Sequence, residues 1–454
     1  MSSKLAAILL LLTSLLPAAA QKPNVVIIFV DDLGYGDLGC YGATDIRTPN
    51  LDRMAEAGMR FTDFHVAAAV CSASRAALLT GKYPLRTDIT GVISANTRRA
   101  LPLEETTLAE RFKELGYATG IFGKWHLGNT PDVWPTRQGF DEWYGTIGSN
   151  DMGKGRPSLE QRRIGKAGVE LVDQDHVASV NPDQSQLTRR YTEKAVDFIG
   201  RNKEKHFFLY VPHNMPHTPL FASERFLGKS KRGIYGDVVE ELDWSAGEIL
   251  KALKQHGIDR NTITLFSSDN GPWLIFGNHG GSAGPFSGGK KQTMEGGMRV
   301  PLIIHWPGHI ERETTCNHFA NAMDLTPTLM TMVGSKSPGA HDGRDITPWI
   351  LKDRNAAVEE RPFFHFWERD IQSVRLGDWK LRLAHTDTQA PNPASIGMDG
   401  ARGEVMEVKR PQALFNLIMD PGETTDLSAK YPEKVDDLMK HAKAGRTSIL
   451  QKKD

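Results

Sequence analysis

Strand-like and helix-like segments alternate between residues 24 and 306 of this chain of 454 residues, and few folds accommodate that order. Asn24–Val30 (NVVIIFV) is a continuous apolar run rich in β-branched residues, which is typical of a strand buried on both faces. The other strand-like segments are 117–123, 206–211, 261–268 and 300–306, and the helix-like segments are 51–58, 107–116, 187–202 and 235–257. The alternation predicts an α/β fold in which helices cover both faces of a mostly parallel sheet.

After about Pro348 the pattern changes, because short strand-like segments follow one another without helices between them. These segments are 362–367, 373–383 and 412–420, and a last helix-like segment covers 432–445. They predict a smaller C-terminal antiparallel sheet with one helix. The polar stretches 153–186 and 385–410 are predicted to be irregular insertions. Since the chain is too long for one ordinary core, we expect a main domain at 21–348 and a C-terminal α+β subdomain at 349–454.

The N-terminal segment 1–20 has the composition of a secretory signal peptide. Lys4 precedes a short apolar stretch, and small residues ending at Ala20 predict cleavage before Gln21. The alternative is a buried N-terminal helix. The apolar stretch is short for a membrane span, and no later segment reaches the necessary length. We expect a secreted or periplasmic protein without a membrane span.

The charge balance argues against one broad class of function. Lysines and arginines together number 55, which equals the number of aspartates and glutamates. A net charge of zero argues against a protein that binds nucleic acid over a large surface, and it permits a local basic pocket.

Residues with oxygen ligands follow two of the predicted strands. Asp31 and Asp32 come directly after the first predicted strand, and Asp269 and Asn270 come directly after the fourth. Ligands of parallel sheets gather at the carboxyl ends of the strands. Three carboxylates and one amide at that edge would suit a hard cation such as calcium or magnesium. The alternative is that Asp-Asp and Asp-Asn-Gly are only turn residues.

The chain has three cysteines. Cysteines of an exported protein are normally paired in disulfides, so an odd number leaves at least one free thiol that requires an explanation. Cys71 precedes the helix-like segment SRAALLTG, whose start Ser72 or Ser74 could cap. Arg75 lies about one helical turn beyond the cysteine. A helix N-terminus and a fixed cation would lower the pKa of the thiol, and they would equally stabilise an anionic ester. The alternative is a small buried apolar residue. The other two cysteines either pair with each other or lie buried.

Three pairs of basic side chains are further candidates. They are Lys124 and His126 after the segment 117–123, His213 and His217 after 206–211, and Lys290 and Lys291 in a glycine-flanked loop. Cations and histidines facing a divalent metal suit an anionic substrate and acid–base catalysis. The alternative for each is an ordinary surface lysine or a structural histidine.

Six motifs together resemble those of the sulfatase family, in its formylglycine-dependent type I, which has the alkaline-phosphatase-like fold. They are DDLGYGD, CSASRAALLTG, GKWHLG, HTP, SSDNG and GGKKQTMEGG. The resemblance covers almost the whole chain after residue 20. QGFDEWYGTIGS and FLGKSKRGIYGD are similar to the branch of arylsulfatase A and N-acetylgalactosamine-6-sulfatase. The resemblance implies a sulfuric ester hydrolase.

The resemblance also implies that Cys71 is oxidised after synthesis to formylglycine (3-oxoalanine), an aldehyde. One hydroxyl of the hydrated aldehyde would attack sulfur, the alcohol would leave, and a sulfated enzyme would form. The second hydroxyl would then expel sulfate, which splits one hard step into two. The conversion requires a formylglycine-generating maturation enzyme. The commoner family motif has proline where this chain has Ala73, so the identity of that enzyme is open.

The family implies one calcium ion per chain and a role for each candidate residue. The implied calcium ligands are Asp31, Asp32, Asp269 and Asn270. The residues implied to act on the formylglycine are Arg75, Lys124 and His126. The residues implied to contact the sulfate and assist the leaving group are His217 and Lys290, with Ser149 as a further contact. His217 is preferred over His213, and Lys290 over Lys291.

The expected substrate is a sulfated carbohydrate or an aryl sulfate, and the branch favours a 6-sulfate on a galactose-type sugar. Specificity is expected from the loops around Arg98 and Arg99 and from the stretch 153–186. Two alternatives stay open. One is a phosphatase or phosphodiesterase of the same superfamily, whose two-zinc members have histidine where this chain has Asn270. The other is a non-catalytic protein that binds sulfated glycans.

Overall fold

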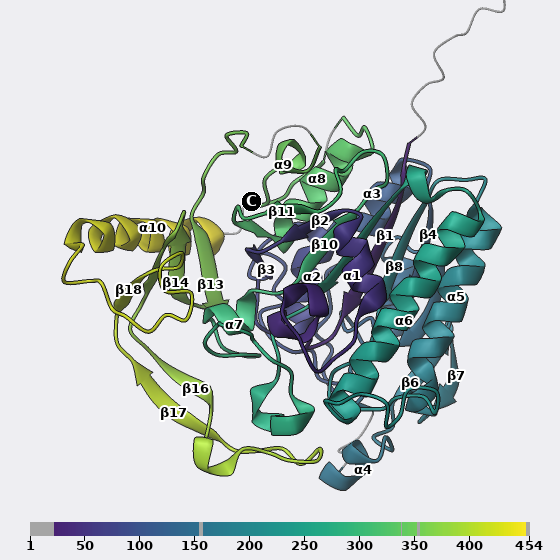
Figure 1. Cartoon of the computed structure of the whole chain (residues 1–454), viewed down its shortest axis with the longest axis horizontal. Coiled ribbons are helices and arrows are strands. Elements are labelled where there is room, and N and C mark those ends of the chain that lie inside the picture. The colour runs from purple at the N-terminus through teal and green to yellow at the C-terminus, as the bar shows by residue number, and fades with distance from the viewer. Residues whose placement is uncertain (1–21, 154–157, 337, 352–354, 451–454) are drawn as a thin grey trace, which may run out of the picture.

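A ten-stranded mixed sheet lies at the centre of the computed structural model, which describes residues 22–153, 158–336, 338–351 and 355–450 (Figure 1). Across the sheet the strands are β11 (Thr314–Cys316), β2 (Met59–Phe61), β10 (Leu302–His305), β9 (Thr262–Ser268), β1 (Asn24–Val30), β8 (Phe207–Pro212), β4 (Ala118–Phe122), β5 (Glu142–Thr146), β6 (Glu170–Asp173) and β7 (His176–Val180). β1 pairs in parallel with β8 and β9, and β4 pairs in parallel with β8 and β5. β10 and β6 join this parallel centre in the antiparallel direction. The predicted α/β fold with a mostly parallel sheet is confirmed.

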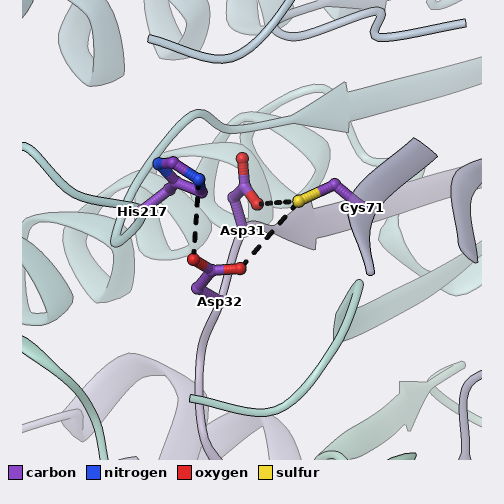
Figure 2. A group of neighbouring side chains, drawn as sticks. All are labelled: Asp31, Asp32, Cys71 and His217. Carbon is purple, nitrogen blue, oxygen red and sulfur yellow. Dashed lines mark hydrogen bonds and ion pairs between the residues drawn. The ribbon is translucent and has the colours of Figure 1, made fainter. Parts of the chain in front are cut away.

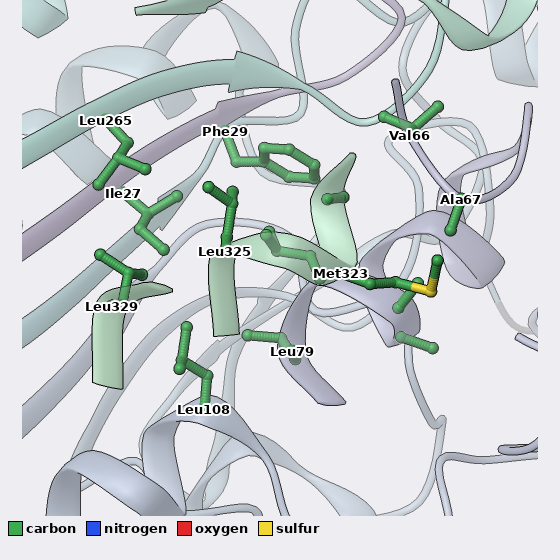
Figure 3. Packing of buried hydrophobic residues seen from close by; sticks show 14 of the residues in the cluster. Ile27, Phe29, Val66, Ala67, Leu79, Leu108, Leu265, Met323, Leu325 and Leu329 are labelled. Carbon is green, nitrogen blue, oxygen red and sulfur yellow. The ribbon is translucent and has the colours of Figure 1, made fainter. Parts of the chain in front are cut away.

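At the centre of the sheet β1 is apolar on both faces, and both faces are buried. Ile27 and Phe29 belong to one buried cluster, whereas Val26 and Ile28 belong to another. The helices on the first face are α2 (Cys71–Thr80), α3 (Leu108–Glu114) and α8 (Leu325–Met332), and those on the second are α1 (Pro49–Glu56), α5 (Leu187–Asn202) and α6 (Ile234–Gln255). Figure 3 shows side chains of α2, α3 and α8 gathered around Ile27. α5 and α6 lie side by side in Figure 1. The strands and helices thus form three layers.

A smaller unit of four antiparallel strands and one helix follows in the sequence. Its elements are β13 (Phe363–Trp367), β14 (Asp370–Leu376), β15 (Trp379–Arg382), β18 (Ala413–Asn416) and α10 (Pro432–Leu450). α10 packs against β14 and β15. In Figure 1 the unit lies at one end of the molecule. The predicted C-terminal antiparallel sheet with one helix is confirmed, and the division of the chain at residue 348, near α9 (Thr347–Leu351), stays a prediction.

Two stretches that were predicted to be irregular contain regular structure. Residues 158–186 include α4 (Leu159–Arg163) and the hairpin of β6 and β7, which extends the main sheet. Residues 385–410 contain a second hairpin, formed by β16 (His385–Pro391) and β17 (Val405–Arg410). The prediction was wrong because β7 and β17 have no buried residue and β16 is mostly polar, so these strands lack the buried apolar alternation by which strands are recognised.

The predicted signal peptide, residues 1–20, lies outside the described residues. Within the described part of the chain, no helix combines the length and the apolar character needed to cross a lipid bilayer. Half-buried Cys40 and buried Cys316 are not joined by a disulfide.

Buried ion pairs join the C-terminal sheet to the residues beside the main sheet. Arg375 of β14 donates to both carboxylate oxygens of Asp63, with Nη1 2.9 Å from Oδ1, and both side chains are almost completely buried. Lys380 of β15 lies 3.0 Å from one carboxylate oxygen of Glu295 in α7 (Glu295–Met298), and His65 in β3 (Phe64–His65) lies 2.9 Å from the other. Removing one member of such a pair leaves an uncompensated buried charge.

Replacing Arg375 with methionine is therefore expected to lower the free energy of unfolding by about 3–5 kcal/mol, because Asp63 then loses its closest buried partner and keeps only the longer contacts with His65 (3.4 Å) and Arg299 (3.6 Å). Urea denaturation followed by circular dichroism measures the change. The control is Arg369→Met: Arg369 pairs with Asp88 across the same junction, but its side chain is 61% exposed. The control should leave the urea midpoint nearly unchanged. Equal destabilisation by both variants would contradict the assignment of the stability to the buried pair.

Candidate active site

The predicted oxygen ligands meet at the carboxyl ends of β1 and β9. These strands are parallel neighbours with Val30 opposite Ser268, so the residues that follow them emerge side by side. The backbone N–H of Asp32 donates to Asp269 Oδ1 at 3.1 Å, and Asn270 Nδ2 donates to Asp32 Oδ1 at 2.7 Å. All four predicted ligands are at most 2% exposed. Asn270 Oδ1 is buried without a hydrogen-bond partner in the described part of the chain.

Cys71 begins α2 and points its thiol at these carboxylates (Figure 2). Its Sγ lies 3.2 Å from Asp31 Oδ1 and 4.0 Å from Asp32 Oδ1. Burial raises the pKa of the thiol well above its usual value, and the charges of Asp269 and Asp31 add to the rise. The prediction of a lowered thiol pKa is wrong, because burial, together with these carboxylates, outweighs the effect of nearby cations and of the helix N-terminus.

The start of α2 also differs from the prediction that Ser72 or Ser74 caps it. Val70 is the N-cap residue, and its side chain makes no capping hydrogen bond. Ser72 Oγ instead accepts a hydrogen bond from the backbone N–H of Ile93 at 3.0 Å. Both serines lie inside the first helical turn, where they cannot serve as caps.

Three buried cations each have a different carboxyl group as their nearest acid, and Arg75 lies in addition 3.8 Å from Asp31. The pairs are Arg75 with Asp269 (2.8 Å), Lys290 with Asp32 (2.7 Å) and Lys124 with Asp31. Burial raises the pKa of Asp269 to about 7, and the charge of Asp31 contributes to this rise. Burial also acts to raise the pKa of Asp31, but Lys124 and the other nearby cations outweigh it and hold that pKa well below its usual value. Three acidic and three basic groups give these six side chains a formal charge of zero.

Two histidines border the cluster, and burial lowers the pKa of both rings, His126 most strongly. His217 Nε2 lies 3.7 Å from Asp32 Oδ2, and His217 Nδ1 lies 2.5 Å from the carbonyl oxygen of Thr218. His126 Nε2 lies 3.0 Å from the carbonyl oxygen of Ile93. Because a carbonyl only accepts, the proton of neutral His217 sits on Nδ1 and that of neutral His126 on Nε2. Each ring therefore keeps one nitrogen able to accept a proton.

The side chains singled out from the sequence form one buried cluster. Ligand atoms of Asp31, Asp32, Cys71 and His217 lie within 4.8 Å of one another. Ser149 Oγ lies 3.4 Å from the His217 ring. His213 contacts α6 instead, since its Nε2 is 3.1 Å from Oγ of Ser245 in that helix. The geometry thus gathers the candidates, and their catalytic roles stay predictions.

Trp273 belongs to this neighbourhood and was missed in the sequence. Its ring centroid lies 5.3 Å from that of His217, and Lys290 Nζ lies 4.3 Å from the indole centroid. The available signal was its position in SSDNGPW, three residues after Asn270 at the end of a buried strand. An aromatic ring there forms the outer wall of the cluster.

Comparison with known families decides what kind of protein this is. The model of the sulfatase family matches residues 23–335, and the model of the C-terminal region of aryl-sulfatase matches residues 358–454. The chain belongs to the sulfatase family. It is accordingly a sulfuric ester hydrolase, as the motifs implied.

This sulfatase is similar to several characterised relatives over most of its length. It is 39% identical to N-acetylgalactosamine-6-sulfatase of Mus musculus over 447 residues, which cover 92% of this chain and 85% of that protein. It is 36% identical to arylsulfatase A of Homo sapiens over 433 residues, covering 90% and 84%. The solved PsFucS1 sulfatase from Pseudoalteromonas sp. matches with a TM-score of 0.83 at 26% identity, covering 96% of this chain and 92% of that one. The resemblance to this branch and the fold are confirmed.

Proposed function

We propose that this sulfatase hydrolyses sulfate esters on carbohydrates, preferring a 6-sulfate on a galactose-type sugar, with calcium and a formylglycine made from Cys71. The observation that carries the proposal is the burial of Cys71 among three carboxyl groups, three cations and two histidines at one sheet edge. The sugar and the sulfate position rest on the similarity to N-acetylgalactosamine-6-sulfatase. We also propose export of the chain, on the composition of residues 1–20.

The residues at the strand ends fit a calcium ion. Asp31, Asp32, Asp269 and Asn270 all offer oxygen atoms, the ligands of a hard cation. Asn270 Oδ1 is buried without a partner in the described residues, and burial, with the nearby charge of Asp31, raises the pKa of Asp269. A cation bound there would coordinate the unpartnered oxygen of Asn270 and would stabilise the ionised carboxylate of Asp269. When bound, calcium would polarise the sulfate oxygens as a Lewis acid.

The environment of Cys71 argues against the thiol itself as the nucleophile. Only a thiolate attacks efficiently, and the raised pKa keeps the thiol protonated. Conversion by a formylglycine-generating maturation enzyme removes this obstacle, since a hydrated aldehyde supplies a hydroxyl nucleophile. Arg75 and Lys124 would then hold the hydroxyl groups at position 71. Which maturation enzyme accepts the Ala73 motif stays open.

The two histidines can move the protons that the reaction requires. His126 Nδ1 is buried without a partner in the described residues, so it can accept a proton from a hydroxyl at position 71. Because Nε2 carries no proton in the neutral ring, His217 would first take one up there from solvent, and it would then give it up readily, because burial lowers the pKa of that ring. His217 would therefore protonate the departing sugar oxygen, while Lys290 and Ser149 hold the sulfate.

Substrate comparison tests the proposal. Release of inorganic sulfate from galactose 6-sulfate should exceed release from galactose 4-sulfate by at least about tenfold in kcat/KM, since position of the ester decides which sugar hydroxyl leaves. Turnover of an aryl sulfate should exceed that of the matching aryl phosphate. Ion chromatography of sulfate and phosphate measures all four reactions.

Two outcomes would contradict the proposed function. Faster turnover of the aryl phosphate would favour a phosphatase or phosphodiesterase. Retention of calcium and of sulfated sugar with no release of sulfate by formylglycine-containing protein would favour a binding protein.

A further inference from the structure

A cavity of about 920 Å³ lies beside the catalytic cluster, and the roles proposed above do not account for it. Thr218 and Trp273 line the cavity and also adjoin His217, through the Thr218 carbonyl and the indole ring. Sites for small molecules typically have roughly 300–1,000 Å³. The cavity therefore has room for sugar units beyond the one that carries the reacting sulfate.

The walls of the cavity come from segments that are far apart in the sequence. One wall is α4 with the neighbouring Asp151, and another is residues 400–402 at the tip of the β16–β17 hairpin. The tip is held in place, because the backbone N–H groups of Gly397 and Gly403 donate to the Ile275 carbonyl at 3.0 and 2.9 Å. At the other end of the hairpin, Gln292 Nε2 donates to Asp387 at 2.7 Å. The C-terminal hairpin is thus fixed against the loop that carries Lys290.

The charges in the cavity are unbalanced. Arg162 pairs with Asp151 at 3.3 Å, and Arg163 pairs with Glu160 at 2.8 Å. Lys291 and Arg402 have no carboxylate partner among the described residues. Burial lowers the pKa of Lys291, and the charges of Lys290 and Arg402 add to the effect, as expected where cations are crowded together.

We propose that this cavity binds an anionic sugar residue next to the sulfated one, with Lys291 and Arg402 contacting its carboxylate or sulfate group. The inference rests on the proposed function and extends it to charged oligosaccharides as substrates. Trp273 and Phe276, whose ring centroids are 4.8 Å apart, give the sugar an apolar surface that runs from the cluster into the cavity. Arg98 and Arg99, where specificity was also expected, do not line it.

Binding of a probe without a reacting sulfate tests this subsite separately from catalysis. The probes are an unsulfated chondroitin tetrasaccharide, which carries uronate carboxylates, and the same tetrasaccharide with its carboxyl groups reduced. Titration calorimetry with wild-type protein should show at least about tenfold tighter binding of the charged probe. A tetrasaccharide whose only charged group is one sulfate ester on an internal sugar, bound to Cys71→Ala protein, tells whether sulfate serves in place of carboxylate.

Arg402→Gln and Lys291→Gln should each weaken binding of the preferred charged probe, and the double variant should abolish the preference. Arg402 is exposed, so its replacement does not threaten folding. The control is Arg137→Gln, an exposed arginine outside the cavity, which should bind as wild type. Equal binding of charged and neutral probes, or a preference that survives the double variant, would overturn the inference. Failure of wild-type protein to release sulfate from galactose 6-sulfate would instead count against the proposed function.

Discussion

Replacement of Cys71 by alanine is expected to lower the turnover number for galactose 6-sulfate by at least about 10,000-fold, because the residue supplies the attacking group. The fold should survive. Alanine suits the first turn of α2, and the thiol contributes only a small side chain to a cluster held by ion pairs. Sulfate release measures the loss, and circular dichroism shows whether the protein is folded.

Cys40→Ala is the matched control, since it removes a thiol that is half-buried and outside the catalytic cluster. This variant should keep wild-type turnover. Substantial sulfate release by Cys71→Ala protein would show that another group attacks sulfur, whereas equal losses in both variants would point to general damage by loss of a thiol.

Removal of the divalent cation is expected to have the second large effect, a loss of at least about 100-fold in turnover. The charges of the three carboxyl groups are balanced by Lys124, Lys290 and Arg75, so a bound divalent cation would supply the net positive charge that attracts a sulfate ester. Chelation followed by gel filtration gives the metal-free protein, and elemental analysis verifies it. Calcium added back should restore the activity.

A matched pair of variants separates a bound ion from a general effect of chelation. Asp269→Asn should reduce calcium retention below one ion per chain, whereas Asp197→Asn on the exposed face of α5 should not. Full turnover by protein from which elemental analysis finds no divalent metal would refute the calcium assignment.

The sequence predicted those parts of the fold that local patterns specify. The amphipathic segment 187–202 became α5 with the same bounds, because its apolar face is continuous and long. Asp31 and Asp269 meet because each follows a strand buried on both faces, and the two strands are parallel neighbours. The sequence alone can therefore predict that carboxylates at the ends of two such strands lie close together, without knowledge of loop conformation.

Other features depend on contacts between distant segments, which local patterns do not contain. The β16–β17 hairpin is polar, and its position depends on the contact of Gln292 with Asp387. The raised pKa of the Cys71 thiol follows from burial beside Asp31, which neither residue's neighbours in sequence reveal. The sequence around Trp273 does not indicate that its ring borders the catalytic cluster, apart from its position after the end of a strand.

The most direct test of the account is the mass of the peptide that contains residue 71, taken from the same preparation whose sulfate release is measured. We expect an aldehyde in place of the thiol, with turnover proportional to the converted fraction. In a host that lacks a suitable maturation enzyme, we expect an intact thiol and minimal turnover. Full turnover by protein in which residue 71 is entirely cysteine would contradict this expectation.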